Sequence, residues 1–267
     1  MVARISVVAL VLAQWLLAAE KRCVLAVFAH PDDEVWWGTG TLLAQYAQEG
    51  HDVYLVTVTS GQLGVTTHAN IPAGPELGAA REEELRCSAK ALGIPPPFAF
   101  GFFDQGLATT LVMDEVARRL RQVINQIQPD VIITHGADGI SGHIDHRITS
   151  VVTTEVFQEQ ERLQHRPKKL YYLVYPESRI PLVAGATDGR RQHRTASDLF
   201  VTTEIDAREA DLASDRALEC HQTQMTARDM EQRKSYHRDV LGGIVFLRLV
   251  MTQGPWPAAK ETSLFGP

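Results

Sequence analysis

The feature that most restricts the fold of this chain is the alternation of short apolar runs, rich in valine and isoleucine, with longer stretches of helical periodicity. In MDEVARRLRQVINQIQ, apolar residues recur three or four positions apart, so one face of that helix can pack on a sheet. This alternation is typical of βαβ units around a parallel sheet. We therefore predict an α/β fold with a Rossmann-like, mostly parallel sheet flanked by helices. The predicted strands are residues 23–29, 52–59, 97–102, 130–135, 169–175 and 198–205, with a last candidate in LGGIVFLRLV.

Length and charge restrict the domain organisation and the class of partner. The 267 residues suffice to bury one sizeable core, and we expect residues 21–267 to form a single α/β domain. The sequence contains no repeat or low-complexity run, which excludes repeat and disordered architectures. A net charge of −6 argues against nucleic-acid binding, because that requires a positive field along one face. A small polar substrate fits this composition better.

The N-terminal segment has the pattern of an export signal. Arg4 is followed by an apolar run over residues 5–19, which is shorter than the roughly 20 residues that span a bilayer. Ala18 and Ala19 offer a cleavage site, so we predict that residues 1–20 are a secretory signal peptide and that the protein is secreted or periplasmic. The alternative is an uncleaved N-terminal anchor, which would associate the protein with a membrane.

The cysteines predict no disulfide framework. Cys23, Cys87 and Cys220 form no CxxC pair, and one thiol is left over even if two are joined. Their mild flanking sequences, such as LRCSA and ALECHQ, suit small side chains packed in the interior. We therefore expect free thiols.

Polar clusters follow four of the predicted strands, at residues 30–34, 60–64, 101–106 and 135–146. Because ligands of an open parallel sheet collect at the carboxyl ends of its strands, we expect the four clusters to share that edge, here called the rim. Most of the histidines outside the HPDD and GHIDH stretches are interpreted as solvated side chains. These histidines are at positions 51, 68, 135, 165, 193, 221 and 237.

The stretch AHPDDE after the first strand carries groups that suit a metal ion. The imidazole of His30 and a carboxylate, on a segment stiffened by Pro31, can reach the same ion, and nitrogen and oxygen ligands suit Zn²⁺. Taken alone, the stretch is explained equally well if Asp33 or Glu34 caps the helix that follows.

A second cluster, HGADGISGHIDHR, favours the metal. It packs His143, Asp145 and His146 into four positions after the fourth strand. Two ligands from the first loop and one from this loop would leave a fourth position for water, which is the arrangement of catalytic zinc. Zinc makes hydroxide available at neutral pH, a leftover carboxylate can act as general base, and a leftover histidine can stabilise an oxyanion. The residues alone do not select between the two aspartates of HPDD or between the two histidines.

These motifs resemble those of the PIG-L/LmbE-like family of zinc-dependent de-N-acetylases, which act on N-acetylglucosaminyl-phosphatidylinositol and on precursors of mycothiol and bacillithiol. AHPDDE and GHIDH carry the resemblance, and TSGQLG, REEEL, GFFDQGL and CHQTQM extend it over residues 23–225. The resemblance implies an LmbE-like fold and these roles: zinc ligands His30, Asp33 and His146; general base Asp32; oxyanion stabiliser His143, with Asp145 favouring its charged form; sugar contacts Arg81, Asp104 and His221.

Some positions depart from the family pattern or have a simpler explanation. Gln62 stands where relatives usually carry glutamate, so the charge of that residue is missing. Arg81 could instead pair with Glu84 along an exposed helix face, and Asp104 could be an ordinary turn residue.

We therefore predict a zinc-dependent hydrolase that removes the N-acetyl group from a small amino sugar or glycoconjugate of the N-acetylglucosamine type. Two other classes fit less well. A carbohydrate-binding module on the same fold would not need the full set of acids and imidazoles. A nucleotide-dependent transferase or oxidoreductase would need a glycine-rich phosphate loop after the first strand, where this chain carries acids that repel phosphate.

Overall fold

The computed structural model describes residues 20–179 and 194–266, which are built around one sheet of seven strands. The strand order is β3-β2-β1-β4-β5-β7-β6. Strands β1 to β5 run parallel, and β7 is antiparallel to its neighbours β5 and β6. The predicted α/β fold with a mostly parallel sheet is therefore confirmed. The strands are β1 (Cys23–Phe28), β2 (Asp52–Thr59), β3 (Phe98–Phe102), β4 (Val131–His135), β5 (Lys169–Leu173), β6 (Thr203–Asp206) and β7 (Ile244–Thr252).

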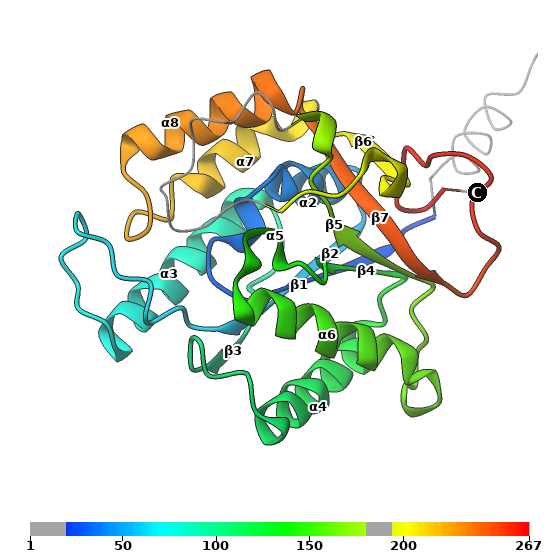
Figure 1. Ribbon diagram of the computed structural model, residues 1–267, viewed down its shortest axis with the longest axis horizontal. Helices are drawn as coiled ribbons and strands as arrows, with labels where there is room; N and C mark the ends of the chain where they lie inside the picture. Colours follow the sequence, from blue (N-terminus) through cyan, green and yellow to red (C-terminus); the bar gives the residue numbers. More distant parts are fainter. Residues whose placement is uncertain (1–19, 180–193, 267) are drawn as a thin grey trace, which may run out of the picture.

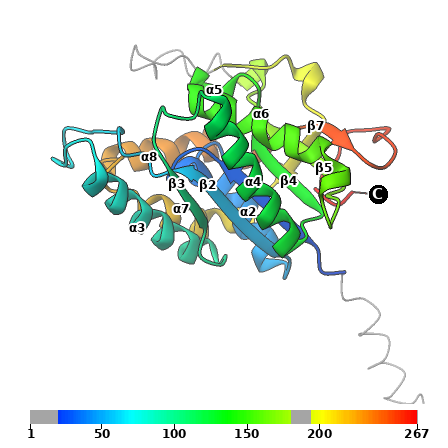
Figure 2. The ribbon, with the colours of Figure 1, turned by 90° about the horizontal axis from the view of Figure 1, so that it is seen from below.

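Helices cover both faces of the sheet, as Figure 1 and Figure 2 show. Two helices pack against each other on one face, and the others lie on the opposite face. The first group is α4 (Thr110–Ile127) and α6 (Ile144–Gln158), and the second is α2 (Thr39–Gln48), α3 (Pro75–Leu92), α7 (Asp211–Leu218) and α8 (Ala227–Ser235). The single-turn helix α5 (Gly139–Gly142) precedes α6.

Strand β1 lies between the two apolar cores. Its residues Val24, Ala26 and Phe28 join the core under α2, α3 and α7, whereas Leu25 and Val27 join the core under α4 and α6. This alternation follows from the period of two in a strand. All six residues of β1 are buried, as expected for a strand covered on both faces, so the segment that follows β1 starts from a fixed position.

The C-terminal third differs most from the prediction. Residues 198–205 were predicted as one strand, but Asp198–Phe200 form a 3-10 turn and only Thr203–Asp206 pair with β7. The prediction also missed α8, which begins with a capping box between Thr226 and Asp229. A threonine followed three positions later by an acidic residue is the pattern that would have indicated this helix.

The prediction of free thiols is wrong for two of the three cysteines. Cys87 on α3 and Cys220, just after α7, form a disulfide across 133 positions of sequence. They meet because α3 and α7 pack side by side, a contact that the flanking sequences do not reveal. Cys23 is a buried free thiol, as predicted.

The predicted signal peptide, residues 1–20, lies outside the described residues except for Glu20. Within the two described ranges, no helix has both the length and the apolar composition needed to cross a bilayer.

Candidate metal and active site

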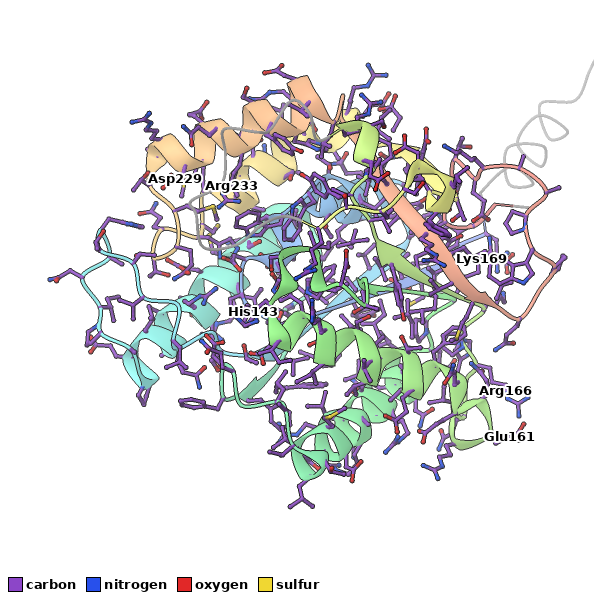
Figure 3. All side chains as sticks on the ribbon, viewed as in Figure 1. His143, Glu161, Arg166, Lys169, Asp229 and Arg233 are labelled. Atoms are coloured by element: carbon purple, nitrogen blue, oxygen red, sulfur yellow. A yellow bond between two sulfur atoms is a disulfide. The ribbon has the colours of Figure 1, made fainter. Side chains whose placement is uncertain are left out.

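The sheet brings the two sequence clusters together at the rim. β1 and β4 are parallel neighbours, with Val27 beside Thr134, so the segments that leave both strands start side by side. The turn after β1 carries His30, and the segment after β4 leads through α5 to the start of α6, where Figure 3 marks His143. These two segments therefore lie at the same rim because β1 and β4 are adjacent in the strand order.

Three side chains from these segments converge. His30 Nδ1 lies 3.1 Å from His146 Nε2, and the two oxygens of Asp33 face these two nitrogens: Oδ1 is 3.2 Å from His146 Nε2, and Oδ2 is 3.6 Å from His30 Nδ1. All three side chains are buried. Ligand atoms held tetrahedrally at the usual zinc distances stand about 3.3 Å apart, so this group can bind one metal ion with little rearrangement.

Hydrogen bonds at the second nitrogen of each ring orient His30 and His146 toward the point where the three side chains converge. His30 directs its other nitrogen, Nε2, at carboxylate oxygens of Asp104 and Asp145, each 3.3 Å away. His146 donates from Nδ1 to the carbonyl oxygen of Gly139 at 2.9 Å. Both rings thereby turn one nitrogen toward the shared point, which is the usual way that proteins orient metal-binding histidines.

The Asp33 carboxylate is also fixed. Its Oδ2 accepts the backbone N–H groups of Ala29 and His30 at 3.1 and 2.8 Å and lies 3.2 Å from His135 Nε2. His135 is therefore an exception among the histidines that were mostly interpreted as solvated: it is fully buried, beside the ligand group. Three further groups that could hold a metal ion share residues with this one: Asp33, His135 and His146; His30, His143 and His146; and His30, Asp104 and Asp145.

Electrostatics link these groups. Burial would lower the pKa of His30, but hydrogen bonds with Asp104, Asp145 and Asp33 raise it well above its usual range. Burial would raise the pKa of Asp33, but the charges of His146 and His135 lower it well below its usual range. For Asp104, the bond to His30 outweighs burial and lowers the pKa to about 2. A cation bound here must displace the proton of His30, so metal binding would release protons.

Asp32 lies beside the ligand group but is more open. Its side chain is 14% exposed, and Oδ1 is 3.3 Å from Arg81 Nη2. Burial raises the pKa of Asp32. The positive charge of Arg81 acts to lower this pKa, and the negative charge of Asp33 raises it further. Its backbone has φ 109°, a region that few side chains adopt and that aspartate and asparagine tolerate better than most.

The alternative that Asp33 or Glu34 caps the following helix is wrong. Helix α2 is preceded by Gly38 without a side-chain cap, and Glu34 instead accepts the N–H of Asp32 and pairs with His221. His221 Nε2 lies 2.6 Å from Glu34 Oε1, and both side chains are fully buried. The described contacts of His221 therefore support the turn after β1, and its predicted sugar contact stays a prediction.

The Glu34–His221 pair predicts a pH-dependent stability. Burial would lower the pKa of His221, but Glu34 raises it above 6.5. The stability that protonated His221 contributes is therefore complete below pH 6.5 and is lost as the pH rises. Burial would raise the pKa of Glu34, but His221 lowers it below 4.5. The stability that ionised Glu34 contributes is therefore lost as the pH falls below 4.5. In urea unfolding of chelator-treated protein, His221→Gln should cost more free energy near pH 5.5 than near pH 8.5. The exposed control His68→Gln should show no such difference, and an equal cost of His221→Gln at both pH values would contradict the prediction.

Arg81 does not pair with Glu84, so that alternative is wrong. Arg81 is buried, donates to the carbonyl oxygens of Gly61 and Pro31, and contacts Asp32, whereas Glu84 accepts hydrogen bonds from Thr223. Gly61 has φ 62°, and a Cβ there would lie 2.1 Å from Arg81 Nη1, so glycine is required for this approach. Arg81 thus ties the turns after β1 and β2 together, and its contact with a sugar stays a prediction.

Asp104 and Asp145 both contact His30, so Asp104 is more than an ordinary turn residue. Asp104 Oδ2 accepts the N–H of Leu63, and Asp145 Oδ2 accepts the N–H of Gln105 at 2.6 Å. All four polar clusters expected at the rim are therefore joined by these contacts. The contact of Asp104 with a sugar, and the effect of Asp145 on the charge of His143, stay predictions.

His143 occupies the N-terminus of α6, where its Nδ1 accepts the N–H of Asp145 at 3.2 Å. Its ring meets the ring of His30 edge-on, with 4.6 Å between centroids. Among the nine predicted site residues, only Asp32 and His143 are partly exposed, and the other seven are buried.

Comparison with known proteins gives three findings. The family model described as GlcNAc-PI de-N-acetylase matches residues 25–157, which contain both HPDD and GHIDH. A 1D-myo-inositol 2-acetamido-2-deoxy-α-D-glucopyranoside deacetylase of Catenulispora acidiphila is 30% identical over 251 residues, covering 78% of this chain and 81% of the relative. Among solved structures, N,N'-diacetylchitobiose deacetylase of Pyrococcus horikoshii matches with a TM-score of 0.66 and 19% identity, over 86% of this chain and 84% of that one.

The fold alone does not select the chemistry. The structure of 4-carboxy-2-hydroxymuconate hydratase of Pseudomonas putida matches with a TM-score of 0.64 and 17% identity, over 89% of this chain and all of that one. At such identity the two structural matches show the fold, so the sequence relationship and the site carry the argument about activity.

Proposed function

This chain belongs to the PIG-L family of de-N-acetylases, and from that membership we propose that it hydrolyses the N-acetyl group of an N-acetylglucosamine-type amino sugar or glycoconjugate with a bound zinc ion. The products are acetate and a free amine. The choice of zinc is supported by the ligand set, two imidazoles and one carboxylate from the protein, which leaves a fourth position for substrate or water.

The observation that carries the proposal is the difference in exposure among the site residues. The three ligand residues and the side chains that orient them are buried, whereas Asp32 and His143 are partly exposed next to them. Groups that hold a metal benefit from burial, and groups that exchange protons with a substrate need access to it. This is the distribution that a hydrolytic site requires.

The proposed reaction divides the work between these two residues. A zinc ion held by His30, Asp33 and His146 would supply Lewis acidity, which would polarise the amide and make water nucleophilic at neutral pH. Asp32 accepts a proton from the attacking water and transfers it to the departing nitrogen, which leaves as the amine. His143 donates a hydrogen bond to the amide oxygen as negative charge develops there. Arg81 holds the Asp32 carboxylate in place during the transfer.

The test is an assay for released amine with protein of measured metal content. We expect zinc-loaded protein to release primary amine, detected with fluorescamine, from at least one of N-acetylglucosamine, N,N'-diacetylchitobiose and N-acetylglucosaminyl-inositol. Chelator-treated protein should be inactive and should recover on addition of zinc. Saturable binding of these sugars to zinc-loaded protein without amine release would contradict hydrolysis and favour a carbohydrate-binding role.

A further inference from the structure

His135 is the last residue of β4, at the edge where β1 and β4 deliver the ligand residues. Its side chain has no exposed surface, and its ring lies 5.0 Å from the ring of Phe28 on the neighbouring strand. A buried imidazole carries two polar nitrogens that need partners, so a histidine here is costly unless the site uses it.

The ring of His135 contacts two of the three proposed ligand residues. Its Nε2 is 3.2 Å from Asp33 Oδ2, and its plane stacks on the ring of His146 with 4.0 Å between centroids and 1° between planes. Its Nδ1 has no hydrogen-bond partner among the described residues. All the polar contact of His135 is thus directed at Asp33.

The direction of that hydrogen bond follows from the partner. An ionised carboxylate only accepts, so the hydrogen lies on His135 Nε2. Asp33 Oδ2 then receives three N–H groups, from Ala29, His30 and His135, while Oδ1 faces His146. With Oδ2 saturated, only Oδ1 is available to a metal.

We propose that His135 is a positioning residue that restricts Asp33 to one-oxygen coordination of the metal and fixes the ring plane of His146. The proposal rests on the proposed metal site, and it gives a reason for a polar ring with an unpartnered nitrogen in a fully buried strand. It assigns a function to a residue that lies outside both sequence motifs.

The first variant, His135→Phe, keeps an aromatic ring in the stack but removes the donor to Asp33. We expect the dissociation constant for zinc, measured by competition with a chromophoric chelator, to rise 10- to 100-fold, which is the range for lost outer contacts of metal ligands. The metal-free variant should be at least as stable as the wild type in urea, because the substitution also removes the unpartnered Nδ1. Weaker metal binding without loss of stability distinguishes positioning from a merely structural role.

The second variant, His135→Gln, places an amide N–H near the position of Nε2. We expect it to restore most of the zinc affinity, to within a few-fold of the wild type. The visible spectrum of the cobalt-substituted protein gives an independent measurement: the Phe variant should lose tetrahedral absorption, because Asp33 Oδ2 keeps only the N–H groups of Ala29 and His30 and can approach the metal, and the Gln variant should retain it. If the Phe variant did not fold, this comparison of Gln with wild type would still test the proposal.

A matched control is available at the other end of β4. His165 Nε2 lies 2.9 Å from the carbonyl oxygen of Pro129, just before the strand begins, so His165→Phe also removes one ring hydrogen bond. This control should leave zinc affinity unchanged. The proposal is overturned if His135→Phe folds and binds zinc within twofold of the wild type, or if His135→Gln folds but has lost the tetrahedral spectrum. Zinc binding without amine release in the wild type would contradict the proposed function. The zinc affinities and cobalt spectra of the His135 variants would still test the positioning role.

Discussion

Asp32→Asn is expected to retain about one zinc ion per chain and to lose turnover by a factor on the order of 10² to 10⁴, the usual contribution of a general base. The amide cannot accept the proton of the attacking water, although it has nearly the same shape as the carboxylate. Asparagine also tolerates the backbone at φ 109°, so this variant avoids the strain that alanine would add. The measurements are zinc content by mass spectrometry and kcat by amine release.

The matched control for this loss is Asp114→Asn, the same change at an exposed position on α4. It should keep both zinc and turnover. Turnover of Asp32→Asn within threefold of the wild type would remove Asp32 from the mechanism. His143 would then be the next candidate for proton transfer, since it is the other partly exposed residue of the predicted set.

Asp33→Asn should abolish both metal binding and turnover. The amide oxygen can still accept the N–H groups of Ala29 and His30, which preserves the turn, but an NH₂ group then faces His146 where a ligand oxygen stood. Two imidazoles without the anionic ligand bind zinc poorly. At free zinc about a thousand times its dissociation constant, the wild type should gain about 4 kcal/mol in unfolding free energy, and this variant should gain almost none.

This result separates the ligand sets that the structure allows. If Asp33→Asn still bound zinc with wild-type affinity, Asp33 would not be a ligand, and two groups would remain as candidate sites: His30, Asp104 and Asp145, and His30, His143 and His146. Asp104→Asn would then release a metal held by the first group and retain one held by the second. Under the present assignment, Asp104 acts only through His30, so Asp104→Asn should weaken zinc binding by no more than 10- to 100-fold.

The sequence predicted the features that depend on local patterns. The apolar runs of β1 and β4 revealed parallel strands, and the position of HPDD and GHIDH after those strands predicted that His30 would meet a histidine of GHIDH, which the structure shows to be His146. This inference succeeds because strand order in a parallel sheet fixes which segments share an edge. It needs no knowledge of side-chain packing.

The features that were missed depend on contacts between distant segments. The sequence placed His135 at the start of the cluster 135–146, but its burial follows only from the packing of β4 between β1 and β5. The pairing of Glu34 with His221 joins residues 187 positions apart. Periodicity predicts which face of a helix or strand is buried, but it does not predict which residue packs against that face.

Because Cys87 and Cys220 form a disulfide, the stability and activity of a protein preparation depend on whether this bond formed during expression. Cys220 immediately precedes His221, which supports the turn that bears Asp32, so the crosslink holds that support against α3. A host with a reducing cytosol would deliver this chain with both sulfurs as thiols, at a cost of about 2–5 kcal/mol in stability. Thiol titration of each batch would therefore show whether a weak specific activity belongs to the enzyme or to incomplete oxidative maturation.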